Sequence, residues 1–309
     1  MTNKFRGLVR KASAFHKPKV QGKRKLLTFL LLFFYAIFLL FFITYSRFSL
    51  RLSYLIPLMF PFALIERRPL KFIYNWSPFY FVIFFYDLFR GIADDLTAGI
   101  NFTLLPSLER AIFGGVIPTV WLQQSLDSIS EGVFGTILTF FYFGHFILPV
   151  TVLYLLWRKN LKLFRIGLGS ITLVSIFAFI TFVIFPAAPP WMASIEGVIP
   201  ETKRLVLFHL TRMLEPLALP QIYIGLNPNE VAPFPSLHAA YATMFFLLSN
   251  KYFPRFRWIF LANTLVVSFT LVLFAEHYVV DVAAGWLYSL ATFTIIEKLP
   301  LDKQIWQAS

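Results

Sequence analysis

"LFRIGLGSITLVSIFAFITFVIF", residues 163 to 185, carries a single charged side chain, Arg165. A transmembrane helix needs about 20 mainly apolar residues, so this stretch is long and apolar enough to cross a bilayer. Similar runs recur along the 309-residue chain, which is 58% hydrophobic and 14% charged. A soluble domain has roughly 25% charged residues. The sequence therefore predicts an all-α, polytopic transmembrane helical bundle.

The distribution of basic residues predicts about eight spans. The weakest candidate is Ser49–Ile65, which contains Pro57 and Pro61. If it crosses and the N-terminus is cytoplasmic, 21 of the 28 Lys and Arg residues lie on the cytoplasmic side, whereas only 14 do otherwise. The positive-inside rule favours the first arrangement, with both termini cytoplasmic. The other predicted spans are Leu27–Tyr45, Phe72–Phe89, Val133–Trp157, Leu163–Phe185, Leu237–Phe253, Trp258–Ala275 and Tyr278–Ile296.

Charge and cysteine content limit the classes of function. Topology explains the net charge of +13 better than a nucleic-acid surface does, because the basic residues sit in short clusters between apolar runs. The absence of cysteine excludes disulfides, thiolate zinc sites and a cysteine nucleophile. We expect a basic cytoplasmic segment over residues 1–26, retained and not cleaved as a signal peptide, one integral domain over 27–298, and a cytoplasmic tail over 299–309.

Two long segments are left on the outer side, Arg90–Gly132 and Pro186–Pro235. Neither is apolar enough to cross the membrane, and both are suited to helices that lie in the interface. Lys203–Glu215 has apolar residues spaced among polar ones as an amphipathic helix would, and Pro106 is expected to break the first segment.

Two histidine clusters lie where predicted spans meet the outer face. In "FPSLHAAYA" (234–242), Ser236 is a good N-cap and His238 falls in the first helical turn, where unpaired amides favour an anion such as phosphate. In "AEHYVVDVAAG" (275–285), His277 and Asp281 are four residues apart and so are neighbours on a helix. We expect Asp281 to accept a proton from one ring nitrogen of His277 and leave the other as nucleophile or base.

Other interpretations of these residues stay open. A single histidine at the end of a span is most often an interfacial residue. Two histidines and a carboxylate can also hold a metal in a metal-dependent hydrolase, but no further ligand at suitable spacing accompanies them, so no metal is expected. A transporter that used the histidines as a proton relay would need polar residues near the middle of several spans, and these spans are mostly Phe, Leu and Ile.

The same residues resemble a known family. Pro-Ser-Leu-His at 235–238 resembles the second signature of the type 2 phosphatidic acid phosphatase superfamily, and the run 277–285 resembles the third. Together with Phe-Pro-x-x-Pro-Pro-Trp at 185–191, they are most similar to the inositol phosphorylceramide synthase branch. The first signature has no convincing match, and the arginine expected six residues before His277 is Leu271.

This resemblance implies a six-span catalytic core and a phosphohistidine intermediate. His277 would attack phosphorus, oriented by Asp281, while His238 would protonate the leaving oxygen and then deprotonate the acceptor. No cofactor or metal is implied. The preferred function is a phosphotransferase that moves a phosphoryl group or phospho-headgroup, such as phosphoinositol, from a phospholipid to a hydroxyl acceptor. A lipid phosphate phosphatase, with water as acceptor, is the alternative.

Further residues are candidates for substrate binding. The expected partners are a phospholipid or lipid phosphate and a lipid or alcohol acceptor, bound at an active site on the extracytoplasmic or lumenal face; nucleic acid is not expected, and the oligomeric state is left open. Trp191 could stack on a headgroup or line the lipid entrance. His145 fits a buried histidine bonded to a backbone carbonyl better than a substrate contact. The remaining candidates, with Arg204 and Arg90 ranked first, are Arg204, Arg90, Lys203, Arg212 and Ser236.

Overall fold

The computed structural model describes residues 69–95, 99–214, 231 and 233–299. Over these ranges the chain is helical and has no strand, apart from one isolated bridge between Asn101 and Ala187. The all-α prediction is confirmed. The chain divides into two compact units, residues 1–76 and 77–309. The first is described only at the start of helix α4, and every contact discussed below lies within the second.

The six predicted spans from Phe72 onward are all helices. Helix α4 continues to Asp95, so Arg90 lies within a helix and not in an outer segment as predicted. The spans predicted at Leu27–Tyr45 and Ser49–Ile65 fall outside the described residues, so the total of eight and the three-part domain division stay predictions. The long helices are α4 (Pro69–Asp95), α8 (Val133–Lys159), α9 (Leu161–Ile184), α13 (Leu237–Tyr252), α14 (Arg257–Leu273) and α15 (Val279–Lys298).

Three stretches of the described chain are long and apolar enough to cross a membrane: 161–184, 254–273 and 279–298. Helix α8 makes a fourth if its two halves, which meet at an angle of 45°, form one span. The bend falls at residues 145–147. Pro149 explains it, because this residue has no N–H to bond the carbonyl of His145 and its ring crowds that carbonyl. The protein is an integral membrane protein.

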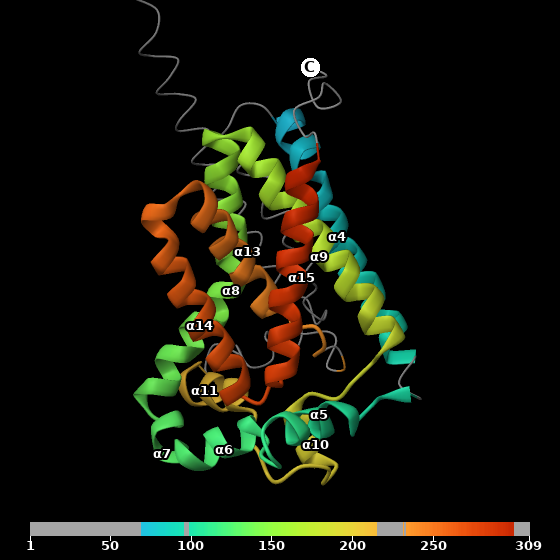
Figure 1. The fold of residues 1–309 in the computed structure, drawn as a ribbon, viewed down its shortest axis with the longest axis vertical. Helices are drawn as coiled ribbons and strands as arrows, with labels where there is room; N and C mark the ends of the chain where they lie inside the picture. The colour runs from blue at the N-terminus through green and yellow to red at the C-terminus, as the bar shows by residue number, and fades with distance from the viewer. Residues whose placement is uncertain (1–68, 96–98, 215–230, 232, 300–309) are drawn as a thin grey trace, which may run out of the picture. The chain divides into compact units, whose positions relative to one another are not determined.

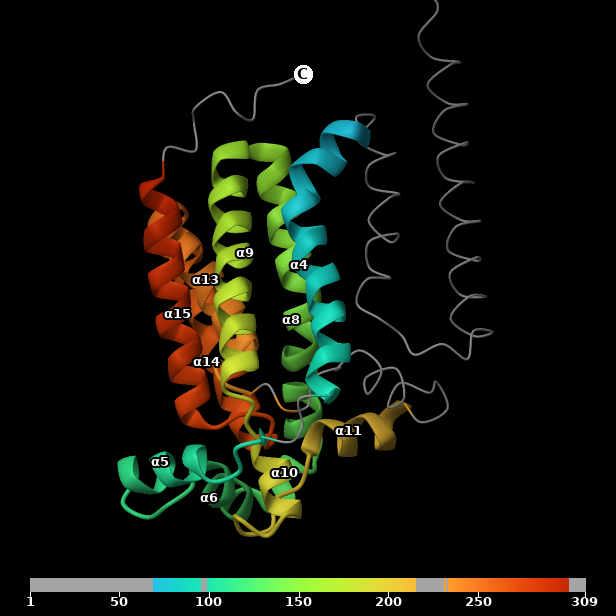
Figure 2. The same ribbon diagram turned by 90° about the vertical axis from the view of Figure 1, so that its right-hand side faces the viewer.

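Short helices gather at one end of the bundle, the end at which α13 and α15 begin (Figures 1 and 2). Within the predicted amphipathic segment Lys203–Glu215, helix α11 begins at Leu205 and is described to Leu214. The prediction for Pro106 was wrong: it lies in the first turn of α5, where a missing N–H removes no helical hydrogen bond. The short helices are α5 (Leu104–Ile112), α6 (Pro118–Ser125), α7 (Asp127–Ser130), α10 (Pro190–Ile195) and α11 (Leu205–Leu214), with a 3₁₀ turn at Pro254–Phe256 near the other end.

Helices α13 and α15 approach closely because small residues face each other. Gly285 of α15 lies against the backbone of α13, and a Cβ at this position would overlap the carbonyl oxygen of Ser236. The same atom would also touch Ala239 and the backbone nitrogen of Ala240, at 3.4 and 3.3 Å. Glycine at 285 therefore sets the distance between the starts of the two helices.

We expect Gly285→Ala to destabilise the protein by about 1–3 kcal/mol, because the new methyl group cannot be placed without moving α13 or α15. Thermal unfolding in detergent measures this loss. Gly144→Ala is the matched control, since a Cβ there meets nothing within 4 Å and alanine favours the helix. Equal unfolding temperatures for the two variants would contradict the packing argument.

Candidate functional site

The structure brings His238 and His277 together. His238 is the second residue of α13, and His277 lies in the turn that joins α14 to α15. His277 Nε2 is 3.4 Å from His238 Nδ1, and the ring planes are inclined by 62°. The two imidazoles therefore meet at the end of the bundle where the short helices gather.

A helix C-terminal motif positions His277. After α14 ends at Leu273, the N–H of Ala275 donates to Val272 O at 3.2 Å and the N–H of Glu276 donates to Leu271 O at 3.1 Å. These two bonds form a Schellman motif, whose left-handed position is usually occupied by glycine. Here Ala275 adopts φ of +61°, which costs an L-residue roughly 1–2 kcal/mol. His277 is therefore positioned by a strained turn.

A backbone carbonyl orients the His277 ring. His277 Nδ1 lies 3.0 Å from Pro233 O and 3.7 Å from Asp281 Oδ2. Since a carbonyl oxygen can only accept, Nδ1 carries the hydrogen and Nε2 keeps its lone pair toward His238. We expected Asp281 to accept this hydrogen, but 3.7 Å is too long for a hydrogen bond, so the direct acceptor is Pro233. Asp281 contributes a nearby charge.

The Asp281 carboxylate caps α15. It is fully buried, and its Oδ2 accepts the N–H of Tyr278 at 2.7 Å. The backbone carbonyl of the same residue accepts the N–H of Ser236 at 3.0 Å, which ties the start of α15 to the start of α13. Ser236 in turn accepts the N–H of Ala239 at 3.3 Å through its side chain and is itself buried. Its predicted N-cap role is confirmed.

A third imidazole lies beside the pair. The ring of His145 is centred 4.1 Å from that of His238, and it also stacks on the ring of Tyr241 at 5.4 Å. The Tyr241 hydroxyl hydrogen-bonds with Ser175 at 2.7 Å. Tyr142 also stacks on His238, with centroids 5.2 Å apart. Two aromatic rings of α8, those of Tyr142 and His145, therefore pack against the His238 imidazole.

Arg204 pairs with Glu276, the residue that precedes His277. Its Nε donates to Glu276 Oε1 at 2.8 Å, and both side chains are largely buried, with 11% and 7% exposed. The guanidinium lies over the ring of Trp191 at 4.3 Å, within cation–π range. The backbone N–H of Trp191 donates to Ala275 O at 3.1 Å. Both residues are thus fixed to the segment that carries His277.

The other basic candidates are engaged elsewhere or lie outside the described side chains. Lys203 forms ion pairs with Glu131 and Asp127, and Glu131 is the main reason that its pKa is raised. Arg212 donates to the Glu131 backbone carbonyl at 3.1 Å. The side chain of Arg90 is not among those described.

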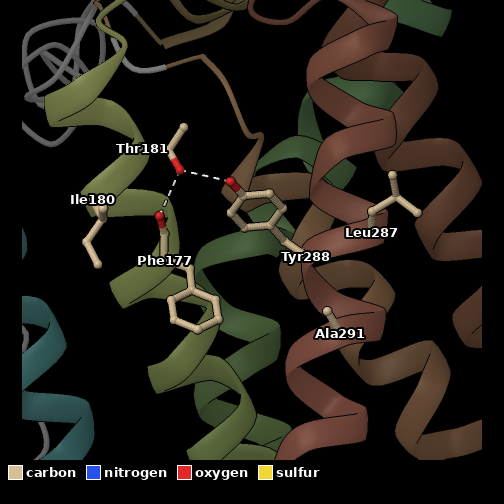
Figure 3. A pocket seen from close by; sticks show the side chains of 6 residues that line it. All are labelled: Phe177, Ile180, Thr181, Leu287, Tyr288 and Ala291. Carbon is tan, nitrogen blue, oxygen red and sulfur yellow. Dashed lines mark hydrogen bonds between the residues drawn. The ribbon is translucent and has the colours of Figure 1, made fainter.

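A groove of about 430 Å³ opens between α9 and α15 (Figure 3). Its polar feature is a hydrogen bond of 2.9 Å between the hydroxyls of Thr181 and Tyr288, and Thr181 also donates to Phe177 O at 2.9 Å. The groove is otherwise apolar, with Phe177, Ile180, Leu287 and Ala291 on its walls.

Three residues of this region escaped the sequence analysis. Pro233 contributes only its backbone, which leaves no signal. Glu276 is visible next to His277, but its partner Arg204 is 72 residues away. Glu109 is a fully buried carboxyl on an amphipathic helix. An acidic residue four positions after Leu105 on the apolar face of α5 was a signal that could have found it.

Among the described residues, no group of three or more His, Asp or Glu side chains is arranged to hold a metal ion. Independence from metal stays a prediction, because it concerns the reaction and not the arrangement alone.

Comparison with known proteins agrees with the histidine motifs. A sequence model of the PAP2 superfamily matches residues 104–295. Inositol phosphorylceramide synthase of Candida albicans is 26% identical over 266 residues, which cover 81% of this chain and 52% of that protein. The catalytic subunit from Schizosaccharomyces pombe is 26% identical over 211 residues (65% and 48%), and that from Saccharomyces cerevisiae is 24% identical over 232 residues (72% and 56%).

The chain spans about half the length of these relatives. No solved structure matches it significantly. The region matched by the superfamily model covers more than half of the chain and contains both histidines, Asp281 and the helices that hold them. The resemblance that the two motifs predicted is confirmed: the chain belongs to the PAP2 superfamily, and its similarity extends to inositol phosphorylceramide synthases.

Proposed function

We propose that the protein is a membrane lipid phosphotransferase that moves phosphoinositol from a phospholipid to the hydroxyl of ceramide. The observation that carries this proposal is the paired imidazoles, with His277 Nδ1 held by Pro233 and Nε2 facing His238 at 3.4 Å. The superfamily match and the names of the relatives support the reaction class and the two lipids. The acceptor hydroxyl distinguishes this reaction from hydrolysis.

In the first step, His277 Nε2 attacks phosphorus, a P–N bond forms, and the P–O bond to diacylglycerol breaks. Protonated His238 donates its proton to the leaving oxygen. In the second step, the acceptor hydroxyl gives its proton to His238 while its oxygen attacks phosphorus and the P–N bond breaks. In-line displacement puts the leaving oxygen on the far side of phosphorus from His277, and His238 is the neighbouring imidazole that we assign to protonate it.

Arg204 is our candidate for stabilising the charge on the phosphoryl oxygens. It takes the place of the arginine that the family pattern expects at position 271, where the structure has a leucine buried in the core. The ion pair with Glu276 and the stacking on Trp191 hold the guanidinium rigidly beside the histidine turn. Preorganised positive groups of this kind stabilise a transition state without reorganisation. The positive end of α13 adds to the effect at His238.

We place the site on the extracytoplasmic or lumenal side, with both termini in the cytoplasm. The charge distribution supports this orientation, because basic clusters lie at the ends of the long helices opposite to the histidines. The groove between α9 and α15 supports entry of lipid chains from the side of the bundle, since its walls are apolar. The basic residues at the far end are Arg158, Lys159, Lys162, Arg165, Lys251, Arg255, Arg257 and Lys298.

Purified protein should convert labelled phosphatidylinositol and ceramide into a new labelled lipid, without added metal and in the presence of a chelator. His277→Ala and His238→Ala should each lower the rate by about 10²–10⁴-fold, because they remove the nucleophile and the general acid and base. His209→Gln is the matched control, since its ring bonds to the Ser130 carbonyl outside the pair. Release of free phosphate or phosphoinositol without a new lipid would contradict transfer, and loss of the product with chelator would contradict metal independence.

Removing one partner of the buried pair should damage both folding and transfer. Arg204→Met leaves Glu276 buried and unpaired, and we expect it to cost about 3–5 kcal/mol of stability. Arg204→Met with Glu276→Gln should recover much of the stability, measured by thermal unfolding, but none of the transfer activity. Lys203→Met, which removes an exposed cation, should leave the unfolding temperature nearly unchanged and the transfer rate within about twofold, because exposed ion pairs contribute little to stability. Recovery of transfer in the double variant would show that Arg204 has only a structural role.

Filling the groove should slow the reaction without unfolding the protein. Ala291→Trp places a large ring between α9 and α15, and we expect a higher KM for the lipid substrates, because the chains lose their route. The matched control is Leu290→Trp, at an exposed position of the same helix that does not line the groove. Rates in detergent with short-chain and long-chain lipids measure the effect, and equal KM values for both variants would rule out this route.

A further inference from the structure

A buried carboxyl group on α5 faces the helix that follows His277. Glu109 has no exposed surface and lies on the same face of α5 as the buried Leu105. Leu104, Leu108 and Ile112 occupy another face of the helix and are exposed by 45%, 41% and 61%. An acidic side chain in such an apolar setting loses its hydration and needs a compensating contact.

That contact is the N-terminus of α15. Glu109 Oε1 accepts the N–H of Val280 at 3.2 Å, across 171 residues of sequence. The first N–H groups of a helix have no partner within the helix. The Tyr278 N–H is already bonded to the Asp281 carboxylate at 2.7 Å. Two carboxyl groups from distant parts of the chain therefore cap the same turn, one from α15 itself and one from α5.

This turn controls the geometry of the histidine pair. It follows directly on His277, and it contains Asp281, whose backbone carbonyl bonds to the Ser236 N–H and so locates the start of α13 and His238. A shift in the first turn of α15 would move both imidazoles relative to each other. Misplacement of reacting groups by about 1 Å can cost 10²-fold in rate.

We propose that Glu109 is a positioning residue that holds the first turn of α15, and through it His277 and His238, in the geometry for phosphoryl transfer. The proposal rests on the proposed transfer reaction at His277. Glu109 itself touches none of the reacting atoms. Its role is to hold the start of α15, which also carries Asp281, through a contact from the short helix α5.

The charge state of Glu109 indicates which substitutions are informative. Burial, and to a smaller extent the charge of Asp281, raise the pKa of Glu109 to about 7, against the lowering effect of its backbone hydrogen bonds. Tyr278 and Arg110 are the other titratable or charged groups that interact with this cluster among the described residues. A neutral acceptor of the same shape should therefore serve as well as the carboxyl group near neutral pH.

The test compares two variants. Glu109→Gln keeps an acceptor oxygen, whereas Glu109→Leu keeps a side chain of similar size without any hydrogen-bond acceptor. Both are made in the full chain and reconstituted in nanodiscs. We expect Glu109→Gln to transfer phosphoinositol within about threefold of the wild type and Glu109→Leu to lose about 10–100-fold in kcat with KM unchanged. Hydrogen exchange of residues 275–285, followed by mass spectrometry, should be faster in Glu109→Leu only.

Leu105→Ala is the matched control. This residue is 1% exposed on the same face of α5, so its loss weakens packing while leaving the carboxyl group in place. If Leu105→Ala lowers kcat and speeds exchange as much as Glu109→Leu, packing of α5 and not the cap is responsible, and the proposal is overturned. Equal kcat and exchange in Glu109→Leu and wild type would also overturn it. Inactive wild-type protein would contradict the transfer reaction instead, and the exchange experiment would still decide whether Glu109 holds the turn.

Discussion

The hydrogen bond of 3.0 Å from the Ser236 N–H to the Asp281 carbonyl joins the starts of two helices that lie far apart in sequence. Helices α13 and α15 can meet there only because residue 285 is a glycine. Each helix start carries a capping side chain, and each lies beside one imidazole. The geometry of the histidine pair therefore follows from backbone packing, and the ring contacts are a consequence of it.

The long helices from Phe72 onward could be predicted from the sequence because their signal is local: about 20 apolar residues in a row identify a span without knowledge of its neighbours. The extension of α4 past Arg90 and the place of Pro106 inside α5 were missed, because helix ends and proline positions depend on the backbone around them. The proximity of His238 and His277 could be predicted because both motifs lie where predicted spans meet the outer face of the membrane.

The finer contacts of the site could not be predicted, because the partners are distant in sequence or belong to the backbone. Pro233 reaches His277 across 44 residues, and Arg204 reaches Glu276 across 72. Arg204, ranked first with Arg90 among the basic candidates, pairs in the structure with Glu276 beside His277. Lys203 and Arg212 have acidic and carbonyl partners on α7 and in the loop that follows it, and these contacts leave no pattern in the sequence.

Ala275 has a consequence for the rigidity of the nucleophile. At a left-handed position, glycine would relieve the strain but would also give the unfolded chain, and a loosened turn, many more backbone states. The alanine methyl group restricts that freedom on both sides of the folding equilibrium. Once the surrounding helices hold the turn in this conformation, few other backbone conformations are accessible to it. The His277 imidazole is therefore restricted to a narrow range of orientations.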